Sequence, residues 1–422
     1  MQADLRGAPP LSPPSSLRAG FAWTLAGNAI YAASQWGLLS ILAKLGGRDV
    51  LGEYALAVAL TAPVAMLAHL NLRAVLATDV SGQRRFRDYI SLRLVVSGLA
   101  LAAMAVMAAV FGRSAGMAAV IFLTGLGQTS ETISDAYYGA MQRRDEMDRI
   151  ARSMMTRGIL SAAAFAAALW LTGELVWAVA AAAAGRLLVL AVYDRRIGSA
   201  DEASGWAETS WSGARSILRQ ALPLGGVLML VSLNTNLPRY VIERQMGVGE
   251  LGAFAAVASF VTAGSTIVNA LGQAATPKLA RLASMHEPAN FLRLAAKLGA
   301  LVFGLGVAGV ACAALLGKVV LTLAYRPEYA AYSGLLVGVM GAAIPGYVAA
   351  ALGYAVTAAR AFDAQVPMFC IVAASCGYAS WLLVPRLGLS GAVVAMAVAA
   401  AAQIGGQALI LRRALRQMEA TA

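Results

Sequence analysis

The sequence predicts an all-α integral membrane protein with about twelve transmembrane helices. The chain has 422 residues, of which 59% are hydrophobic and only 13% are charged. Roughly a quarter of the residues of a soluble protein are charged, so this composition excludes an ordinary soluble fold. The apolar residues form runs of ~20, the helix length that crosses a bilayer, and short clusters of basic residues separate these runs. Such spacing is typical of a multi-pass membrane protein.

The apolar runs define the expected spans in chain order. Pro238 and Pro345 fall inside the seventh and tenth spans, where they predict kinks because proline removes a helical hydrogen bond. The proline-rich residues 1–19 are predicted to be a disordered cytosolic leader, because they lack the apolar region and cleavage site of a secretory signal. The expected spans are 20–43, 51–78, 90–112, 116–140, 153–172, 175–193, 221–242, 251–275, 295–317, 331–358, 367–384 and 390–411.

The basic residues predict the orientation of the spans. Most of them gather on the side of the N-terminus, in a set that includes Arg93 and Arg157. The positive-inside rule then places both termini in the cytoplasm. Because the net charge of +12 comes from these clusters, we expect no binding to nucleic acid. The opposite side holds Lys44, Arg48, Arg113, Arg244, Lys318, Arg326 and Arg386.

Two stretches of the chain are alike at an offset of 200 residues. The sequence LGEYALAV at 51–58 matches LGAFAAVA at 251–258 in Leu, Gly, an aromatic residue and Ala. We therefore predict two copies of six spans. Because six is even, both copies have the same orientation, and the pseudo-twofold axis that relates them lies along the membrane normal. The expected parts are a six-helix bundle at 20–193, a cytosolic linker at 194–220, a second six-helix bundle at 221–411 and a cytosolic tail at 412–422.

Polar residues inside the seventh span mark a candidate binding site. Ser232, Asn236, Arg239 and Glu243 follow helical spacing and therefore share one face of the helix. An arginine that faces lipid costs several kcal/mol, so Arg239 is expected to face the bundle interior or a wet cavity. The alternative is a side chain that snorkels to the membrane surface.

The first, second and sixth spans extend this candidate site. Arg186 lies near the middle of the sixth span, and it is expected to face a cavity or an interhelical partner because snorkelling is hardest there. Arg73 lies nearer the cytoplasmic end of the second span, where an interfacial anchor is the alternative. Asn28, Tyr31 and Gln35 share one face of the first span, and they either contact cargo or hydrogen-bond to neighbouring helices.

Three carboxylates are candidates for ion coupling or for a gate. Glu131 and Asp135 lie one turn apart in the fourth span, just before a basic run, and Glu243 ends the polar face of the seventh span. Paired carboxylates relay protons or bind a cation in membrane transporters. The alternative is a structural network of salt bridges that closes the cytoplasmic side.

The sequence predicts no metal site, disulfide or cofactor. Cys312, Cys370 and Cys376 lie in apolar runs and have no metal-ligand spacing with His69 or His286. No Ser/His/Asp triad or phosphate-binding loop can be assembled, and the loops on the extracytoplasmic side are too short for an active-site domain. We therefore do not expect an enzyme.

Arginines in the interior suit an anionic cargo. Guanidinium groups pair bidentately with phosphate or carboxylate oxygens and stay charged when water is removed. A lipid diphosphate that carries sugars fits this chemistry, because Asn, Gln and Tyr side chains can hydrogen-bond to sugar hydroxyls. Charge alone leaves a nucleotide or an organic anion as alternatives.

Five segments carry a resemblance to a known family, and together they extend over nearly the whole chain: LGEYALAVALTAPVAMLAHLNLRAVLATD (51–79), SDAYYGAMQRRDEMDRIARSMMTRG (134–158), ALPLGGVLMLVSLNTNLPRY (221–240), VNALGQAATPKLA (268–280) and LTLAYRPEYA (321–330). They resemble the Wzx-type polysaccharide-unit flippases of the multidrug/oligosaccharidyl-lipid/polysaccharide (MOP) exporter superfamily.

The resemblance implies a MATE-like fold, in which two six-helix bundles face a central cavity and work by alternating access. The implied cargo is a polyprenyl-diphosphate-linked oligosaccharide that crosses the inner, cytoplasmic membrane for O-antigen, capsule or exopolysaccharide assembly. It also implies a cationic cavity, in agreement with Arg73, Arg186 and Arg239. The candidate coupling ions are H+ and Na+, and the candidate protein partners are a polysaccharide polymerase and glycosyltransferases.

Two other functions remain as alternatives. A cation-coupled multidrug exporter would share the fold, but related exporters often keep a coupling carboxylate in the cavity of one bundle, and the first span has none. A membrane polysaccharide polymerase or ligase would present a long extracytoplasmic loop with catalytic Arg or His, and no such loop is expected.

Overall fold

The computed structural model describes residues 17–78, 86–198, 211–361 and 364–421. In this part of the chain the regular secondary structure is helical. Residues 1–16 of the expected leader, 199–210 of the expected linker and Ala422 of the expected tail lie outside the described residues.

The helices follow one another with short connections. Their bounds are α1 Leu17–His69, α2 Leu72–Thr78, α3 Phe86–Phe111, α4 Ala115–Arg143, α5 Met147–Thr172, α6 Leu175–Val189, the π-helix η1 Leu190–Asp194, α7 Arg195–Gly198, α8 Trp211–Met246, α9 Val248–Ser284, α10 Pro288–Ala324, the 3-10 helix η2 Pro327–Tyr332, α11 Ser333–Ala358, α12 Gln365–Leu387 and α13 Leu389–Thr421.

Ten helices of the described chain are long and apolar enough to cross a membrane. Helix α1 contains two of the expected spans, because Gly47 interrupts its helical backbone with φ 79° and ψ −171°. Helix α4 corresponds to the expected span at 116–140, and its polar residues, such as Glu131 and Asp135, keep it outside the apolar set. These two features account for the difference between ten apolar helices and twelve expected spans.

The second expected span is not one continuous helix. Helix α1 ends at His69, and Leu70 and Asn71 adopt positive φ angles of 49° and 50° before α2 begins. The Arg93 guanidinium donates hydrogen bonds to the carbonyls of Ala68 (2.7 Å) and His69 (3.0 Å). It thereby satisfies backbone acceptors that a helix end leaves open. We expected Arg93 among the basic residues on the side of the N-terminus, and the structure places it within α3, where it is completely buried.

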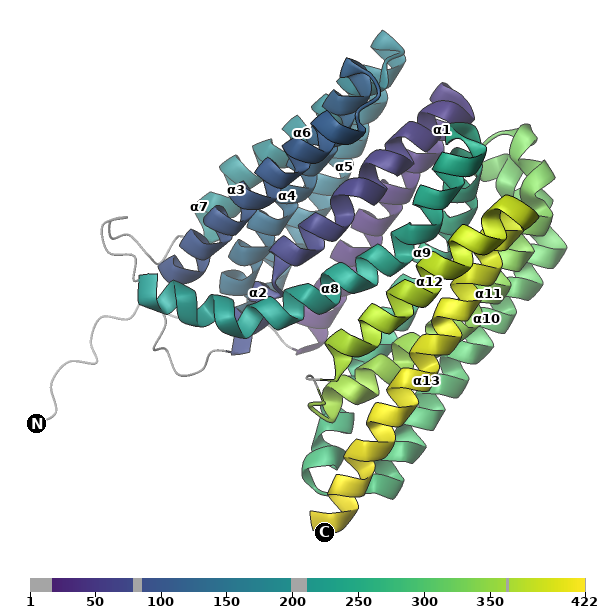
Figure 1. Ribbon diagram of the computed structural model, residues 1–422. Coiled ribbons are helices and arrows are strands. Elements are labelled where there is room, and N and C mark those ends of the chain that lie inside the picture. The colour runs from purple at the N-terminus through teal and green to yellow at the C-terminus, as the bar shows by residue number, and fades with distance from the viewer. Residues whose placement is uncertain (1–16, 79–85, 199–210, 362–363, 422) are drawn as a thin grey trace, which may run out of the picture.

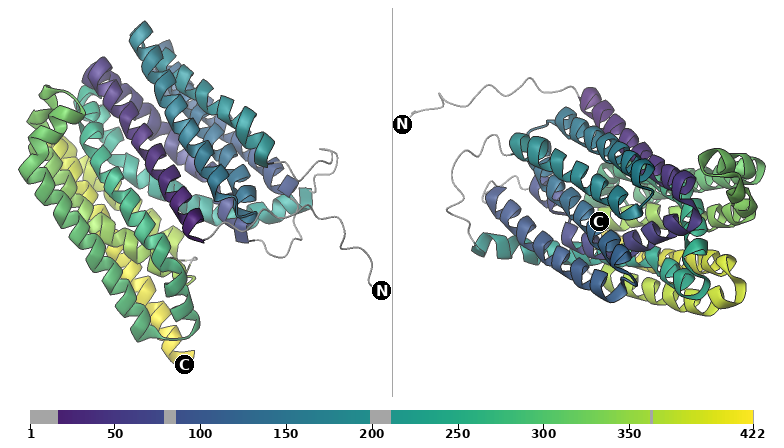
Figure 2. Two further views of the ribbon diagram at one scale, coloured as in Figure 1. Left: turned by 180° about the vertical axis from the view of Figure 1, so that it is seen from behind. Right: turned by 90° about the horizontal axis from the view of Figure 1, so that it is seen from above.

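The helices form two groups that diverge like the arms of a V (Figure 1). The first bundle contains α1 to α7 and the second contains α8 to α13. The bundles meet at the end where α8 passes into α9, which we call the contact end. The start of α1 and the end of α13 lie at the opposite end, the terminal end, as the view from behind also shows (Figure 2).

A reciprocal contact relates the two bundles by pseudo-twofold symmetry. A Cβ added to Gly52 would lie 1.9 Å from the carbonyl oxygen of Val248, and one added to Gly252 would lie 2.0 Å from that of Arg48. Residues at offset 200 thus exchange roles, as they do across a twofold axis. Gly247 also repeats the backbone of Gly47, with φ 89° and ψ 174°. The predicted fold of two related bundles is confirmed.

Helix α8 packs against both bundles. Its first turns bury Ala214, Ile217 and Ala221 in an apolar cluster formed by Leu70 and residues of α2 to α5. Farther along, Val227 and Leu230 pack against a cluster in the second bundle. The transition lies near Gly225, where an added Cβ would lie 2.8 Å from the carbonyl oxygen of Leu67 in α1. Helix α8 therefore connects the bundles mechanically as well as covalently.

The reciprocal glycine contact generates a stability prediction. Gly52→Ala or Gly252→Ala places a methyl group against a backbone carbonyl that cannot move alone, and we expect each change to destabilise the protein by about 1–3 kcal/mol or to prevent folding. Thermal unfolding of the purified protein in detergent measures the effect. The matched control is Gly304→Ala in α10, where an added Cβ meets no atom within 4 Å. Equal melting temperatures for Gly52→Ala and Gly304→Ala would contradict the proposed close approach.

Candidate functional site: buried charge in the two bundles

A cluster of polar side chains lies inside the first bundle. The Arg186 side chain on α6 is 8% exposed, and its Nε lies 3.2 Å from Oε1 of Glu131 on α4. The Tyr31 hydroxyl on α1 donates to the same carboxylate oxygen at 2.7 Å. Gln35, one turn farther along α1, accepts from Nη2 of Arg186 at 3.4 Å. Four candidate residues from three expected spans thus meet at one place.

A glycine makes room for this cluster. Gly127 precedes Glu131 by one turn on α4, so the two positions share a helix face. A Cβ at Gly127 would lie 2.6 Å from Nη1 of Arg186. The absent side chain allows the guanidinium to lie against the α4 backbone beside its carboxylate partner. A buried ion pair requires such geometry, because removing both charges from water costs several kcal/mol per ion.

Arg157 joins the same region from α5. It is 4% exposed, and its guanidinium carbon lies 5.3 Å from the ring centre of Tyr31 and 5.5 Å from that of Tyr138. Its Nε and Nη1 have no hydrogen-bond partner among the described residues. We expected Arg157 in the basic segment on the cytoplasmic side, and the structure places it inside α5, where it is buried.

A carboxylate that the sequence analysis missed lies on a π-helix. Asp194 ends η1 and is completely buried. Ser153 donates to its Oδ1, and the Ser153 hydroxyl also lies 2.7 Å from the hydroxyl of Tyr138. A π-helical turn changes the direction in which side chains project, and such turns are frequent at functional sites. No pattern in the sequence indicates this turn.

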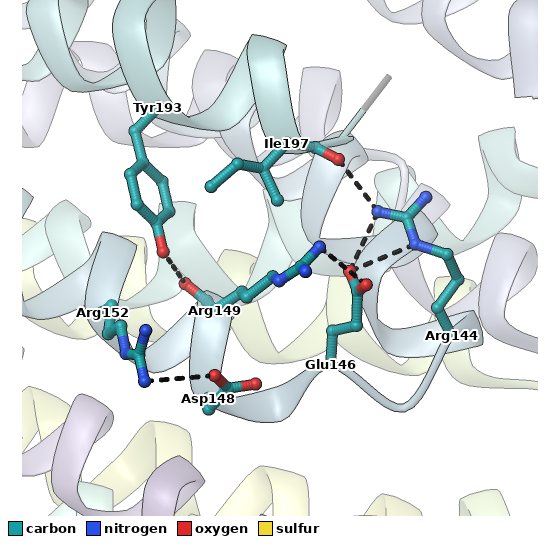
Figure 3. Close-up of polar contacts among 7 residues, drawn as sticks. All are labelled: Arg144, Glu146, Asp148, Arg149, Arg152, Tyr193 and Ile197. Atoms are coloured by element: carbon teal, nitrogen blue, oxygen red, sulfur yellow. Dashed lines mark hydrogen bonds and ion pairs between the residues drawn. The ribbon is translucent and has the colours of Figure 1, made fainter. Parts of the chain in front are cut away.

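The basic run after α4 forms a network of its own at the terminal end (Figure 3). Glu146 accepts from Arg144 at 3.0 Å and from Arg149 at 2.8 Å, and Arg144 also donates to the carbonyl of Ile197 at 3.0 Å. The hydroxyl of Tyr193 donates to the carbonyl of Arg149 at 3.3 Å. These contacts tie the α4–α5 turn to the end of the sixth span. Among the described residues, the ion pairs of this network use Glu146 and Asp148, and neither Glu131 nor Asp135 takes part.

Asp135 forms a second cluster in the first bundle. Nε2 of His69 lies 3.1 Å from its Oδ2, and Nη1 of Arg73 lies 3.6 Å from its Oδ1. Arg73 also donates from Nε to Gln142 at 2.8 Å, and it lies over the Tyr138 ring at 5.7 Å. The two predicted residues Arg73 and Asp135 therefore form an ion pair with each other, close to His69, where α1 ends.

A third cluster lies on α8 and contains a cation without a carboxylate. Nη1 of Arg239 donates to Oδ1 of Asn236 at 3.1 Å, and the Asn236 amide donates to the carbonyl of Ser232 at 2.8 Å. Among the described residues Arg239 forms no ion pair, and its buried Nε has no hydrogen-bond partner. The predicted polar face of α8 thus exists as a connected set with one uncompensated charge.

The remaining two candidates lie apart from these clusters. Glu243 pairs with Arg113 across the bundle interface, with Oε1 2.7 Å from Nη2. Asn28 is exposed on α1, and its amide donates to the carbonyl of Thr24 at 2.8 Å. Glu243 therefore belongs to the contact end, and Asn28 contacts none of the other candidates through a hydrogen bond in the described structure.

Several other contacts join the two bundles at the contact end. Arg48 donates to the hydroxyl of Tyr332 at 2.7 Å and lies 3.8 Å from Glu250. Lys44 donates to the carbonyl of Leu323 at 2.8 Å, and Arg326 donates back to the carbonyl of Lys44 at 2.9 Å. These reciprocal bonds, together with the Arg113–Glu243 pair, hold this end closed. The basic residues in these contacts are ones that we assigned to the side opposite the N-terminus: Lys44, Arg48, Arg113 and Arg326.

The described helices define the class by fold, a helical protein with ten helices long and apolar enough to cross a membrane, arranged as in solved MATE-type structures. The structure is similar to an inward-facing multidrug resistance MATE family transporter of the MOP superfamily, with a TM-score of 0.71 and 15% identity over 94% of this chain and 99% of that chain. It is also similar to the lipid II flippase MurJ in an inward closed conformation, with a TM-score of 0.71 and 10% identity over 94% of this chain and 90% of that chain.

The sequence comparison identifies the family. Residues 17–283 match the family model described as polysaccharide biosynthesis protein, and the chain belongs to that family. It is 24% identical over 384 residues to the capsular polysaccharide biosynthesis protein CapF of Staphylococcus aureus, which covers 90% of this chain and 95% of the relative. The expected resemblance to polysaccharide transporters of the MOP superfamily is confirmed.

The Arg186–Glu131 pair generates a testable prediction. Glu131→Ala leaves Arg186 buried without its counter-ion, so we expect a loss of about 3–5 kcal/mol in stability. In the double variant Glu131→Ala/Arg186→Ala the uncompensated charge is gone, and the melting temperature should recover in part. Thermal unfolding of the two single variants and the double variant gives the coupling free energy. Glu174→Ala, in an exposed turn, is the control. Additive losses would show that the two side chains do not interact.

Proposed function

We propose that this transporter flips a polyprenyl-diphosphate-linked oligosaccharide across the cytoplasmic membrane for surface polysaccharide assembly. The observation that carries the proposal is the uncompensated Arg239 on the helix that packs against both bundles. A buried charge within a membrane-spanning segment is expensive and marks a substrate pathway by default. An anionic cargo would supply the counter-charge that the described residues around Arg239 do not.

The chemistry around Arg239 fits a diphosphate. Guanidinium binds phosphate oxygens through paired donors, and it stays charged in a low-dielectric site. Asn236 and Ser232 continue the same face of α8 and offer amide and hydroxyl groups to the cargo. In the first bundle Arg186, Arg73, Tyr31, Gln35 and Asn28 are the further proposed contacts. Of these, Arg186 is held by Glu131, so cargo phosphate would compete with that carboxylate.

The arrangement of the bundles supports alternating access. By the positive-inside rule, the contact end faces outward and the diverging terminal end faces the cytoplasm, with both chain termini there. The Arg113–Glu243 pair then acts as part of an extracytoplasmic gate. Glu131 and Asp135 are the proposed coupling groups for H+ or Na+, because each is a carboxylate held by cations inside a bundle.

Comparisons with known proteins support this cargo over the alternatives. The family description and the name of CapF concern polysaccharide biosynthesis, and the MurJ structure is described as a lipid II flippase. Polysaccharide assembly and lipid flipping together favour a lipid-linked saccharide as the cargo. A polymerase and glycosyltransferases are the partners that such a pathway implies. A cation-coupled multidrug exporter is the second candidate, favoured by the MATE-like fold alone. A polymerase or ligase is disfavoured, because the loops that join helices at the contact end are short. Four pairs of helices are joined there by three residues or fewer, namely residues 112–114, 173–174, 247 and 388.

Removing the charge of Arg239 tests the proposed function directly. We expect Arg239→Ala to reduce flipping of the lipid-linked oligosaccharide by tenfold or more, since a charge-assisted contact contributes about 1.5–3 kcal/mol, while membrane insertion and expression stay normal. Cells that lack the wild-type protein provide the assay, in which unflipped units accumulate on the cytoplasmic face and surface polymer is lost.

Two controls make this test specific. Arg239→Lys keeps the charge without the planar fork and should retain part of the activity. Arg293→Ala removes an exposed arginine on α10 and should have no effect. Normal surface polymer after complete loss of the protein, together with new drug sensitivity, would instead identify an exporter.

The gate generates a separate prediction. Glu243→Gln weakens the Arg113–Glu243 pair, and we expect the contact end to open about two- to fivefold more often, the effect of losing roughly 1 kcal/mol. The measurement is the rate at which a membrane-impermeant maleimide labels Ser40→Cys, a position at the bundle interface, in a variant without the three native cysteines. Glu174→Gln, in an exposed turn between α5 and α6, is the control. Unchanged labelling in Glu243→Gln would contradict a gating role.

A further inference from the structure

Five aromatic rings form a continuous column at the bundle interface. We call Trp36, Phe260, Tyr325, Tyr329 and Tyr332 the aromatic column. Neighbouring ring centres along this order lie 6.2, 6.1, 5.3 and 6.5 Å apart. Trp36 belongs to α1 of the first bundle, whereas the other four rings belong to α9 and to the α10–α11 connection of the second bundle. The column therefore crosses from one bundle to the other.

The column runs from the interior of the protein to the contact end. Trp36 lies about three helical turns before Gly47 along α1, and Phe260 lies at a similar distance after Gly247 along α9. At the other end of the column the Tyr332 hydroxyl accepts from Arg48 at 2.7 Å and lies 3.2 Å from Glu250. A molecule that leaves through the contact end would pass along these rings.

The two copies of the repeat differ at this depth. At the offset of 200 residues, Trp36 occupies the position that Asn236 occupies in the second copy. Asn236 holds Arg239, the proposed phosphate ligand, whereas Trp36 presents an indole that is 38% exposed and meets the Phe260 ring edge-to-face at 67°. One half of the interface thus offers cationic and amide chemistry, and the other half offers an aromatic surface.

One hydroxyl of the column has no partner. The Tyr325 hydroxyl donates to the carbonyl of Ala256 at 3.0 Å and lies 2.7 Å from the hydroxyl of Ser259. The Tyr329 hydroxyl, in contrast, belongs to a fully buried residue and has no hydrogen-bond partner in the described structure. An unpaired buried hydroxyl opposes the closed state. A phenylalanine would seal the interface without this cost, so sealing alone does not explain a tyrosine here.

We propose that the aromatic column binds the sugar rings of the cargo as they pass the contact end. The inference rests on the proposed function. The C–H face of a pyranose ring stacks on an aromatic ring, and its hydroxyl groups pair with tyrosine hydroxyls. When the bundles separate, Trp36 and Arg48 move away from the second-bundle rings. Their faces and the Tyr329 hydroxyl then become accessible to sugar, while Arg239 holds the diphosphate.

Transport of two lipids tests this assignment. Proteoliposomes carry either the polyprenyl diphosphate with its oligosaccharide, extracted from cells without the transporter, or the same polyprenyl diphosphate without sugars. We expect Trp36→Ala to slow transport of the sugar-bearing lipid by up to about tenfold and to leave transport of the bare lipid diphosphate unchanged. Trp36→Phe keeps an aromatic face and should restore most of the rate.

Tyr329→Phe provides a second variant that keeps the ring and removes only the unpaired hydroxyl. It should raise the melting temperature and selectively slow transport of the sugar-bearing lipid. Trp170→Ala, which removes a 74% exposed ring on α5 outside the column, is the matched control and should change neither rate.

The outcomes separate this inference from the proposed function. Equal slowing of both lipids by Trp36→Ala and Tyr329→Phe would show that the column serves only to close the gate, and would overturn the inference. Unchanged rates in both variants would overturn it as well. If the wild-type protein moves the bare lipid diphosphate but not the sugar-bearing one, the inference is wrong while an anion transporter remains. If the wild-type protein moves neither lipid, the proposed function fails, and the inference fails with it.

Discussion

The close approach of two backbone segments at the contact end determines how the bundles meet. Gly52 lies against the carbonyl of Val248, and Gly252 lies against that of Arg48, at distances that exclude any side chain. This reciprocal contact lies at the pseudo-twofold axis, so every pair of equivalent positions is placed around it. It also brings the interruption of α1 at Gly47 close to the α8–α9 junction, which positions the gate contacts and the aromatic column between the bundles. Equivalent residues of the two bundles therefore lie at the same depth, so a difference in residue type between them gives the two bundles different functions there.

The arginines inside the helices are stabilised in different ways, and the differences separate structural from functional roles. Arg93 donates to the carbonyls that end α1, and Arg186 pairs with Glu131. Arg157 lies between two tyrosine rings close to that pair. Arg239 has only the amide oxygen of Asn236. Among the described residues neither Arg157 nor Arg239 forms an ion pair, but Arg157 is enclosed between two rings at 4% exposure, whereas Arg239 is only partly buried. Since a cation inside a membrane span needs compensation, Arg239 is the stronger candidate for contact with an anion that arrives from outside the chain.

The fold was largely predictable from the sequence, because the constraint that organises it acts on both halves. Close approach demands glycine at 52 and at 252, and a break demands glycine at 47 and at 247, so the repeat is visible in the sequence. Tyr31, Gln35, Glu131 and Arg186 stand out singly for a similar reason, since each is polar within an apolar run. Their meeting in one cluster depends on helix packing, which no spacing along the chain reveals.

Other parts of the site could not be predicted for physical reasons. A basic residue near the end of an apolar run gives the same signal whether it points to the surface or inward, so the burial of Arg93 and Arg157 was not predicted. Burial of Asp194 follows from a π-helical turn without a sequence signature. The Arg113–Glu243 pair and the aromatic column join residues from different bundles, and they exist only because the contact end is closed.

The distance between the cargo diphosphate and the Arg239 guanidinium is the most direct measure of the central claim. Solid-state NMR of the ¹⁵N-arginine-labelled protein in lipid, loaded with the polyprenyl-diphosphate-linked oligosaccharide, reports ³¹P–¹⁵N dipolar coupling. The account predicts a coupling that corresponds to direct hydrogen bonding, a few ångströms, which weakens in Arg239→Lys because its strongest contribution is lost. Cargo that binds with no such coupling, or with a coupling that is unchanged in Arg239→Lys, would contradict it.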